Sequence, residues 1–131
     1  MNEVIKCLVE RRSCKKYLPR QVDEAALQEV LLAGTYAPSG RNRQAAKILV
    51  VQKPEDVAAL QRLNAAVLGN PEGKRFYGAP TVLVVLADAE VNTAVEDGSV
   101  VMENLMIAAH SLGLGSCWVH RAREVFASDE G

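Results

Sequence analysis

The stretch Ala94-Val-Glu-Asp-Gly-Ser-Val-Val-Met-Glu-Asn-Leu-Met-Ile-Ala-Ala-His-Ser-Leu112 is the longest helical pattern in the chain and the most informative about its fold. At 100° per residue, its polar side chains fall within one arc of about 160°. These side chains are Glu96, Asp97, Ser99, Glu103, Asn104, His110 and Ser111. Val100 and Ile107 interrupt that arc, and the opposite side is apolar. Such a helix either packs against a second molecule or lies buried within one chain. We expect the first, a homodimer with this helix in the interface.

Shorter patterns surround this helix. A helix near Val4 leads to Arg11, and a second helix starts at an Asp23 N-cap and ends before Pro38. Gly34 either caps the second helix or thins it for a close neighbour. The other expected elements are a buried strand at 48–51, a helix from Pro54 to near Asn64, a central strand at 81–86, a short strand at 117–119 and a helix within 120–127. The segment 68–78 is a surface loop or a flap.

Length and composition describe a single globular domain over residues 1–131, with a formal net charge of −1. This charge gives no overall field for DNA or for an anionic membrane. No apolar run approaches the ~18 residues of a membrane span. Cys7, Cys14 and Cys117 form an odd set without metal-ligand spacing, so we expect no metal and no disulfide. A reducing, cytoplasmic location fits this cysteine content.

Arg11-Arg-Ser-Cys-Lys-Lys-Tyr17 concentrates four cations and the short hydroxyl side chain of serine in seven residues. Arginine offers a planar fork of donors to phosphate oxygens, serine adds a hydroxyl donor and lysine a mobile charge. Taken alone, the stretch also reads as a solvated basic turn. Nucleic-acid binding through Arg11–Arg20 is not expected, because only Tyr17 is interleaved as an aromatic residue.

Two further segments are rich in polar or small residues. Ala37-Pro-Ser-Gly-Arg-Asn-Arg-Gln44 has no apolar residue between Pro38 and Ala45, so it faces water, faces a polar ligand, or is a capped turn that starts a helix. Gly113-Leu-Gly-Ser116 follows the long helix. This order is the reverse of the dinucleotide fingerprint, which follows a strand and opens a helix. Its glycines still allow a flat ligand to come close to the backbone.

Four segments, in the order in which they occur, resemble the nitroreductase family of FMN oxidoreductases. They are the Arg11–Tyr17 cluster, the Ala-Pro-Ser-Gly-Arg-Asn-Arg-Gln loop, the Tyr77-Gly-Ala-Pro80 strand entry and Leu112-Gly-Leu-Gly-Ser-Cys-Trp118. The resemblance covers essentially the whole chain. It implies an α+β fold with a central, mostly antiparallel sheet flanked by helices, in an intertwined homodimer with two FMN molecules at the subunit interface.

The resemblance also implies roles for individual residues. Arg11 and Ser13 would hold the FMN phosphate, Arg12 would reach phosphate or ribityl oxygens, and Lys15 would approach the pyrimidine side of the ring. The other cofactor-binding residues would be Pro38, Ser39 and Asn42 from the partner subunit, Asn64 at the ring, and Leu114, Gly115 and Ser116 beside it. No catalytic side chain is expected, because the flavin carries the chemistry.

The implied activity is hydride transfer from NADH or NADPH, through FMN, to a nitro compound, a quinone or a similar small acceptor by a ping-pong mechanism. Gln44 is followed by Ala45-Ala46 where the family usually has proline and a large residue, which predicts a roomier substrate side. The family's C-terminal helix, strand and arm are not found, which suggests an artificially shortened chain or a natural fragment. The alternative hypothesis is a shortened, non-catalytic dimer that binds a nucleotide or flavin or serves as a scaffold.

Overall fold

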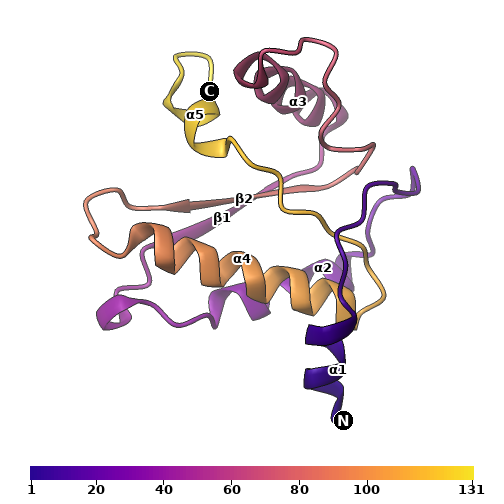
Figure 1. The fold of residues 1–131 in the computed structure, drawn as a ribbon, viewed down its shortest axis with the longest axis vertical. Helices are drawn as coiled ribbons and strands as arrows, with labels where there is room; N and C mark the ends of the chain where they lie inside the picture. The colour runs from indigo at the N-terminus through magenta and orange to yellow at the C-terminus, as the bar shows by residue number, and fades with distance from the viewer.

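The computed structural model describes all 131 residues, in an α+β arrangement (Figure 1). Its elements are α1 (Glu3–Glu10), α2 (Glu24–Thr35), the 3₁₀ turn η1 (Gly40–Asn42), β1 (Ala46–Val51), α3 (Pro54–Leu68), β2 (Val82–Ala87), α4 (Ala94–Ser111) and α5 (Ala122–Ala127). The two strands form a ribbon between the α2–α4 pair on one side and α3 with α5 on the other, and α1 projects at one end. The predicted α+β class is confirmed.

The core lies where α4 crosses α2. Val101, Leu105 and Ala109 form the buried stripe of α4, and Val30 of α2 packs into the same cluster. The two helices approach closely at Gly34, because a Cβ atom built there would lie 2.6 Å from Leu105 Cδ2. Gly34 therefore thins α2 for a neighbour, one of the two roles expected from the sequence.

The sheet has two antiparallel strands, with Ile48 opposite Val85 and Val50 opposite Leu83. The predicted strand at 48–51 forms within β1, but the expectation that it is buried is wrong, since Leu49 and Val50 are 42% and 40% exposed. The expectation that 81–86 is a central strand is also wrong, because β2 has a strand on one side only. An apolar run shows which side chains favour burial. Whether they are buried depends on strands or helices from elsewhere that pack against them.

Two other expectations need correction. The predicted strand at 117–119 does not form, because pairing in this region is limited to one isolated bridge between Ser13 and Ser116. The helix expected to end near Asn64 continues to Leu68, where Gly69 adopts the left-handed conformation at φ 78° and stops it. Nothing in the residues near Asn64 ends the helix. A glycine directly after the last helical residue is the usual signal for a helix end, and here that residue is Gly69.

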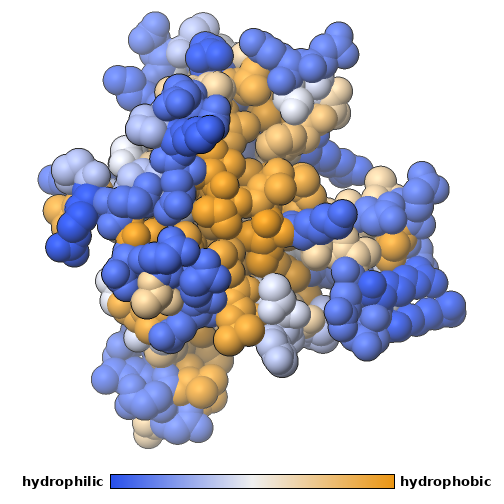
Figure 2. All heavy atoms as spheres, turned by 180° about the vertical axis from the view of Figure 1, so that it is seen from behind, coloured by the Kyte–Doolittle hydropathy of each residue, from blue (hydrophilic) through white to orange (hydrophobic).

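Several apolar side chains remain exposed. They include Val4, Ile5, Leu8 and Val9 on α1 and Val95 and Val100 on α4. Figure 2 shows a continuous apolar area across the middle of the face opposite to the one seen in Figure 1. An exposed apolar area of this kind is available for contact with another molecule. No helix in the chain combines the length and the apolar content that crossing a bilayer requires.

The polar arc predicted on α4 is not all on the outside. Asp97 is only 4% exposed, and the Asn104 side-chain amide donates to the Ala33 carbonyl of α2 at 2.9 Å. Both residues lie near the edges of the arc, where a neighbouring segment can offer them a hydrogen-bond partner. A helical wheel treats every polar residue as outward-facing, and it therefore missed these two contacts.

Candidate functional site

Two of the predicted ligand-binding segments meet in the structure. Ser13 and Ser116 form a parallel bridge, and the Cys14 backbone N–H donates to the Ser116 carbonyl at 2.9 Å. The bridge places the basic cluster Arg11–Tyr17 beside the turn Gly113–Ser116, although about a hundred residues separate them in the sequence. This Gly113–Ser116 segment is held against the end of α4, because the Leu114 N–H donates to the Ala109 carbonyl at 2.9 Å.

Arg11 is the cation of this region whose side chain is partly buried. Its Nη1 atom is buried and has no hydrogen-bond partner. A buried donor without an acceptor costs roughly 1–3 kcal/mol, more when it is charged. Because Arg11 and Ser13 are only two residues apart, the segment can offer a guanidinium fork and a hydroxyl to one anionic group.

The next cations behave differently from Arg11. Arg12 Nη1 donates to the carbonyls of Val9 and Arg11 at 2.7 and 2.8 Å, so this guanidinium satisfies carbonyl groups at the end of α1. Lys15 is exposed, and its Nζ lies 5.8 Å from the centre of the Tyr77 ring. The segment 68–78, which includes Tyr77, thus reaches the basic cluster.

Tyr17 holds the cluster in shape. Its hydroxyl donates to the Cys14 carbonyl at 2.6 Å. Burial, together with the nearby thiols of Cys14 and Cys117, raises the pKa of Tyr17 to about 12. The hydroxyl therefore remains a neutral donor at physiological pH, and its bond closes the turn from Cys14 to Tyr17.

The raised pKa of Tyr17 predicts a loss of folding stability at alkaline pH. Below about pH 10, Tyr17 is protonated in both the folded and unfolded states, so its contribution is fully present. Between about pH 10 and 12 the unfolded chain releases this proton more readily, and stability falls. We expect the urea midpoint to drop over this range, and to drop less in Tyr17→Phe. An equal drop in both proteins would contradict the assignment.

Gly115 allows the turn to lie against the basic cluster. A Cβ atom built there would lie 2.9 Å from both Cβ and Sγ of Cys14, and 3.5 Å from Tyr17 Cε1. Real Cβ atoms do not approach a neighbour so closely, so the two segments require glycine at this position.

Gly115→Ala should therefore push the two segments apart and weaken ligand binding about tenfold or more, while the α2–α4 core remains intact. Cys14→Gly should restore binding in the double variant, because it removes both atoms of the clash. Cys14→Ala should not, since its Cβ stays in place. Isothermal titration with FMN provides the measurement, and equal rescue by both second changes would contradict the account.

The loop at 37–44 lies elsewhere in the chain. Ser39 Oγ accepts from Gln44 N–H at 3.0 Å, and Asn42 Oδ1 accepts from Gln44 Nε2 at 3.0 Å. The Gly40 N–H donates to Asp97 Oδ1 at 2.9 Å, so this loop is attached to the first turn of α4. The turn Gly113–Ser116 follows the last turn of the same helix. α4 has eighteen residues and is therefore ~27 Å long, so the two segments lie near its opposite ends.

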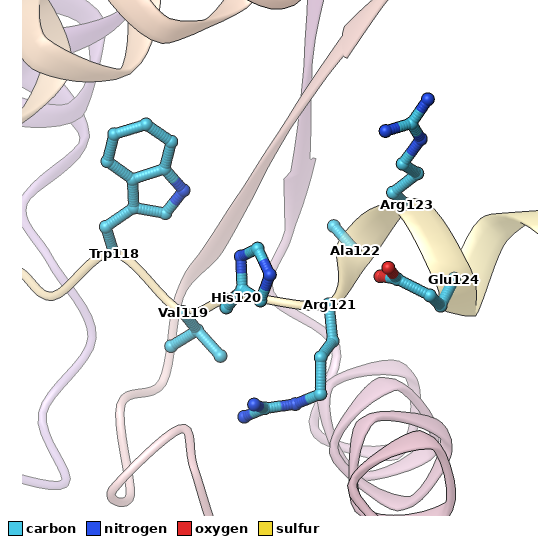
Figure 3. Close-up of a pocket in the computed structure, with 7 residues that line it drawn as sticks. All are labelled: Trp118, Val119, His120, Arg121, Ala122, Arg123 and Glu124. Atoms are coloured by element: carbon cyan, nitrogen blue, oxygen red, sulfur yellow. The ribbon is translucent and has the colours of Figure 1, made fainter.

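Asn64 occupies a buried position between α3 and α5. It is 4% exposed, its Nδ2 donates to the His120 carbonyl at 2.9 Å, and its Oδ1 accepts from Arg121 Nη2 at 3.3 Å. In Figure 3 the Arg121 side chain extends away from Arg123, which points in the opposite direction. A shallow hollow of about 260 Å³ is lined by Trp118, Val119, His120, Arg121, Ala122, Arg123 and Glu124.

The structure thus divides the predicted site residues into groups. One region contains Arg11, Arg12, Ser13, Lys15, Leu114, Gly115 and Ser116. The other end of α4 holds the loop with Pro38, Ser39 and Asn42, and Asn64 lies separately against the segment that leads into α5. Sequence reasoning noted Asp97 and Tyr17 but gave them no structural role, and it did not single out Arg121. Thr93 is the N-cap residue of α4, and its hydroxyl donates to Asp97 Oδ2 instead of capping the helix.

The fold and this region define an α+β chain with a cationic cradle beside a glycine turn. The chain belongs to the nitroreductase family, whose profile, described as "Nitroreductase family", matches residues 8–125. A relative from Archaeoglobus fulgidus, provisionally named an NADH dehydrogenase/NAD(P)H nitroreductase, is 32% identical over 91% of this chain and 68% of its own length. A relative of the same name from Methanothermobacter thermautotrophicus is 29% identical over 88% of this chain and 60% of its own length.

Among solved structures, a nitroreductase with bound FMN from Bacteroides fragilis is 28% identical and superposes with a TM-score of 0.85. The superposition covers 97% of this chain and 78% of that protein. The resemblance inferred from the four motifs is therefore confirmed at the level of family and fold. The chain spans about three fifths to two thirds of the length of its two archaeal relatives.

Proposed function

We propose that this chain is an FMN-dependent oxidoreductase that uses NADH or NADPH to reduce a nitro compound, a quinone or a similar small acceptor by ping-pong turnover. The observation that carries the proposal is the buried Arg11 Nη1, which has no partner, two residues before Ser13 and its bridge to Ser116. A phosphate would supply the missing acceptor. The FMN-bound relative from Bacteroides fragilis and the NAD(P)H nitroreductase name of the archaeal relatives support this choice of cofactor and reductant.

In this proposal the chain's own residues bind and orient the cofactor. Arg11 and Ser13 hold the phosphate, and Arg12 adds positive charge close by. Lys15 places a cation beside the pyrimidine edge, where electron-rich groups are stabilised by a nearby positive charge. The backbone of Leu114, Gly115 and Ser116 lines the ring, and Gly115 is exposed. FMN, when bound, supplies the hydride-accepting and electron-donating chemistry.

The proposal includes a homodimer in which each site is completed by Pro38, Ser39 and Asn42 of the partner subunit. Its support is α4, which is ~27 Å long and places these residues near one end and the Arg11 cluster of the same chain near the other. The exposed apolar side chains of α1 and the apolar area in Figure 2 supply surface for such an interface. The alternative expected for α4, complete burial within one chain, does not suit Val100, which is 37% exposed.

Three finer points belong to the proposal. Direct contact between Asn64 and the flavin ring stays a prediction. In the structure its side-chain amide is already hydrogen-bonded to His120 and Arg121. Ala45 and Ala46 leave a wider acceptor side than a large residue would. A reducing location such as the cytoplasm suits the three cysteines, which are all unpaired.

The test is to purify the protein, reconstitute it with FMN and add NADH or NADPH without oxygen. We expect a yellow protein whose visible absorbance is bleached and then restored by a nitro compound or a quinone. A colourless protein that cannot be reconstituted would contradict the proposal. A yellow protein that is not bleached by either nucleotide would favour the alternative, a non-catalytic flavin-binding dimer.

A further inference from the structure

Asp97 is a buried acid at the start of α4, at the opposite end of the helix from the Arg11 cluster. Both of its carboxylate oxygens are engaged: Oδ1 accepts from Gly40 N–H and Oδ2 accepts from Thr93 Oγ1, each at 2.9 Å. Only 4% of the residue is exposed. A buried carboxylate is costly unless donors surround it, and here the donors come from the helix cap and from the loop 37–44. The carboxylate therefore joins this loop to α4.

The loop needs such an attachment because its backbone is strained. Arg41, Asn42 and Gln44 all have left-handed conformations, with φ of 54°, 53° and 53°. Residues with side chains adopt this conformation rarely, and they persist there only when surrounding contacts hold them. The Gly40 N–H bond to Asp97 attaches the loop to α4 immediately before the three strained residues.

The approach of Gly40 to α4 is also close. A Cβ atom built on Gly40 would lie 3.1 Å from Cβ and Cγ2 of Thr93 and nearer still to its hydroxyl. The loop therefore fits against Thr93 only with glycine at this position. Three residues, Gly40, Thr93 and Asp97, thus form one anchor for the segment that contains Ser39 and Asn42.

We infer that Asp97 is a positioning residue: it holds the loop 37–44 in the shape in which Ser39 and Asn42 complete the site of the partner subunit. Asp97 touches no ligand itself. The anchoring is a property of the single chain, whereas its use by the partner rests on the proposed function. One helix then serves two sites, because the turn Gly113–Ser116 after its last residue lies at the chain's own Arg11 cluster, and its first turn holds the loop for the other site.

The anchoring is tested in flavin-free protein by hydrogen exchange at the Gly40 amide. Asp97→Ala should speed exchange at this amide about tenfold or more. Asp97→Asn should give an intermediate rate, since it keeps one acceptor oxygen. Glu96→Ala is the matched control, because Glu96 is the exposed neighbour in the same helical turn and should change nothing. If Asp97→Asn and Asp97→Ala both leave Gly40 exchange at the wild-type rate, the inference is overturned.

The use of the loop by the partner is tested with mixed dimers. Chains carrying Asp97→Asn and chains carrying Arg11→Met are co-expressed with different tags, and the mixed dimer is isolated. It should bind one FMN per dimer with wild-type affinity, because one of its two sites combines an intact Arg11 with an intact loop. Each parent dimer should bind about tenfold more weakly or worse. A general folding defect caused by Asp97→Asn would not be repaired in this way.

A mixed dimer that binds no better than its parents overturns the positioning role. Failure of the proposed function has a different signature, in which the wild-type protein itself binds no FMN. In that case the Gly40 exchange rates still decide whether Asp97 anchors the loop.

Discussion

Replacement of Arg11 by methionine should abolish most FMN binding while leaving the flavin-free protein as stable as before, or more stable. The guanidinium Nη1 is buried without a partner, so an apolar side chain of similar length removes an unsatisfied donor. The phosphate, in contrast, loses a charged hydrogen bond of about 1.5–3 kcal/mol, which corresponds to roughly 10–100-fold in affinity. FMN titration and thermal unfolding with and without FMN measure both effects.

Two neighbouring cations provide the controls. Lys16→Ala removes an exposed charge and should change FMN affinity little. Arg12→Ala removes donors to the carbonyls of Val9 and Arg11, so it should lower the stability of the flavin-free protein more than Arg11→Met does. A large loss of stability in Arg11→Met, together with an undiminished FMN-dependent rise in Tm, would contradict a phosphate-binding role for Arg11.

The contact between α2 and α4 should give the largest loss of stability. Leu105→Ala removes a side chain that is only 3% exposed and should cost about 2–5 kcal/mol. Gly34→Ala should cost about 1–3 kcal/mol, because the new Cβ would lie 2.6 Å from Leu105 Cδ2 and 2.8 Å from Ile48 Cδ1. Urea unfolding provides both values.

The two changes should not add. In the double variant the new methyl group at position 34 enters the space that Leu105 has left, so the loss should be smaller than the sum by about 1 kcal/mol. Gly98→Ala is the matched control, since a Cβ built there lies 3.8 Å from its nearest neighbours, and it should stabilise α4 by about 0.5–1 kcal/mol. Strict additivity at Gly34 and Leu105, or an equal loss at Gly98, would contradict this description of the core.

The sequence predicted the features that depend on local chemistry. The Asp23 N-cap accepts from Ala26 N–H at 3.4 Å as its residue type suggests, and α4 covers Ala94–Ser111 within one residue of the predicted range. The Arg11 cluster and the Gly113–Ser116 turn were both identified, because each has an unusual composition over a few residues. That they lie side by side was available only through the family resemblance, since nothing in either segment specifies the other.

The features that sequence reasoning missed depend on distant partners. Asp97 was placed on the polar arc of α4, but the N–H of Gly40 draws it inward. The strand expected at 117–119 has suitable residues but no strand beside it, and a strand exists only as part of a pair. Arg121 takes its left-handed conformation at φ 84° where it bonds the buried Asn64, a contact between residues 57 apart. Local propensity carries no information about such contacts.

The central claim is that a cradle formed by Arg11, Ser13 and Ser116 of one chain is closed around FMN by the loop 37–44 of a second chain. Native mass spectrometry of the protein after addition of FMN tests this claim most directly. The account predicts one dominant species of two 14.2 kDa chains with two flavins, and loss of both flavins in the Arg11→Met protein. A single chain that retains one flavin, or a dimer that binds none, would contradict it.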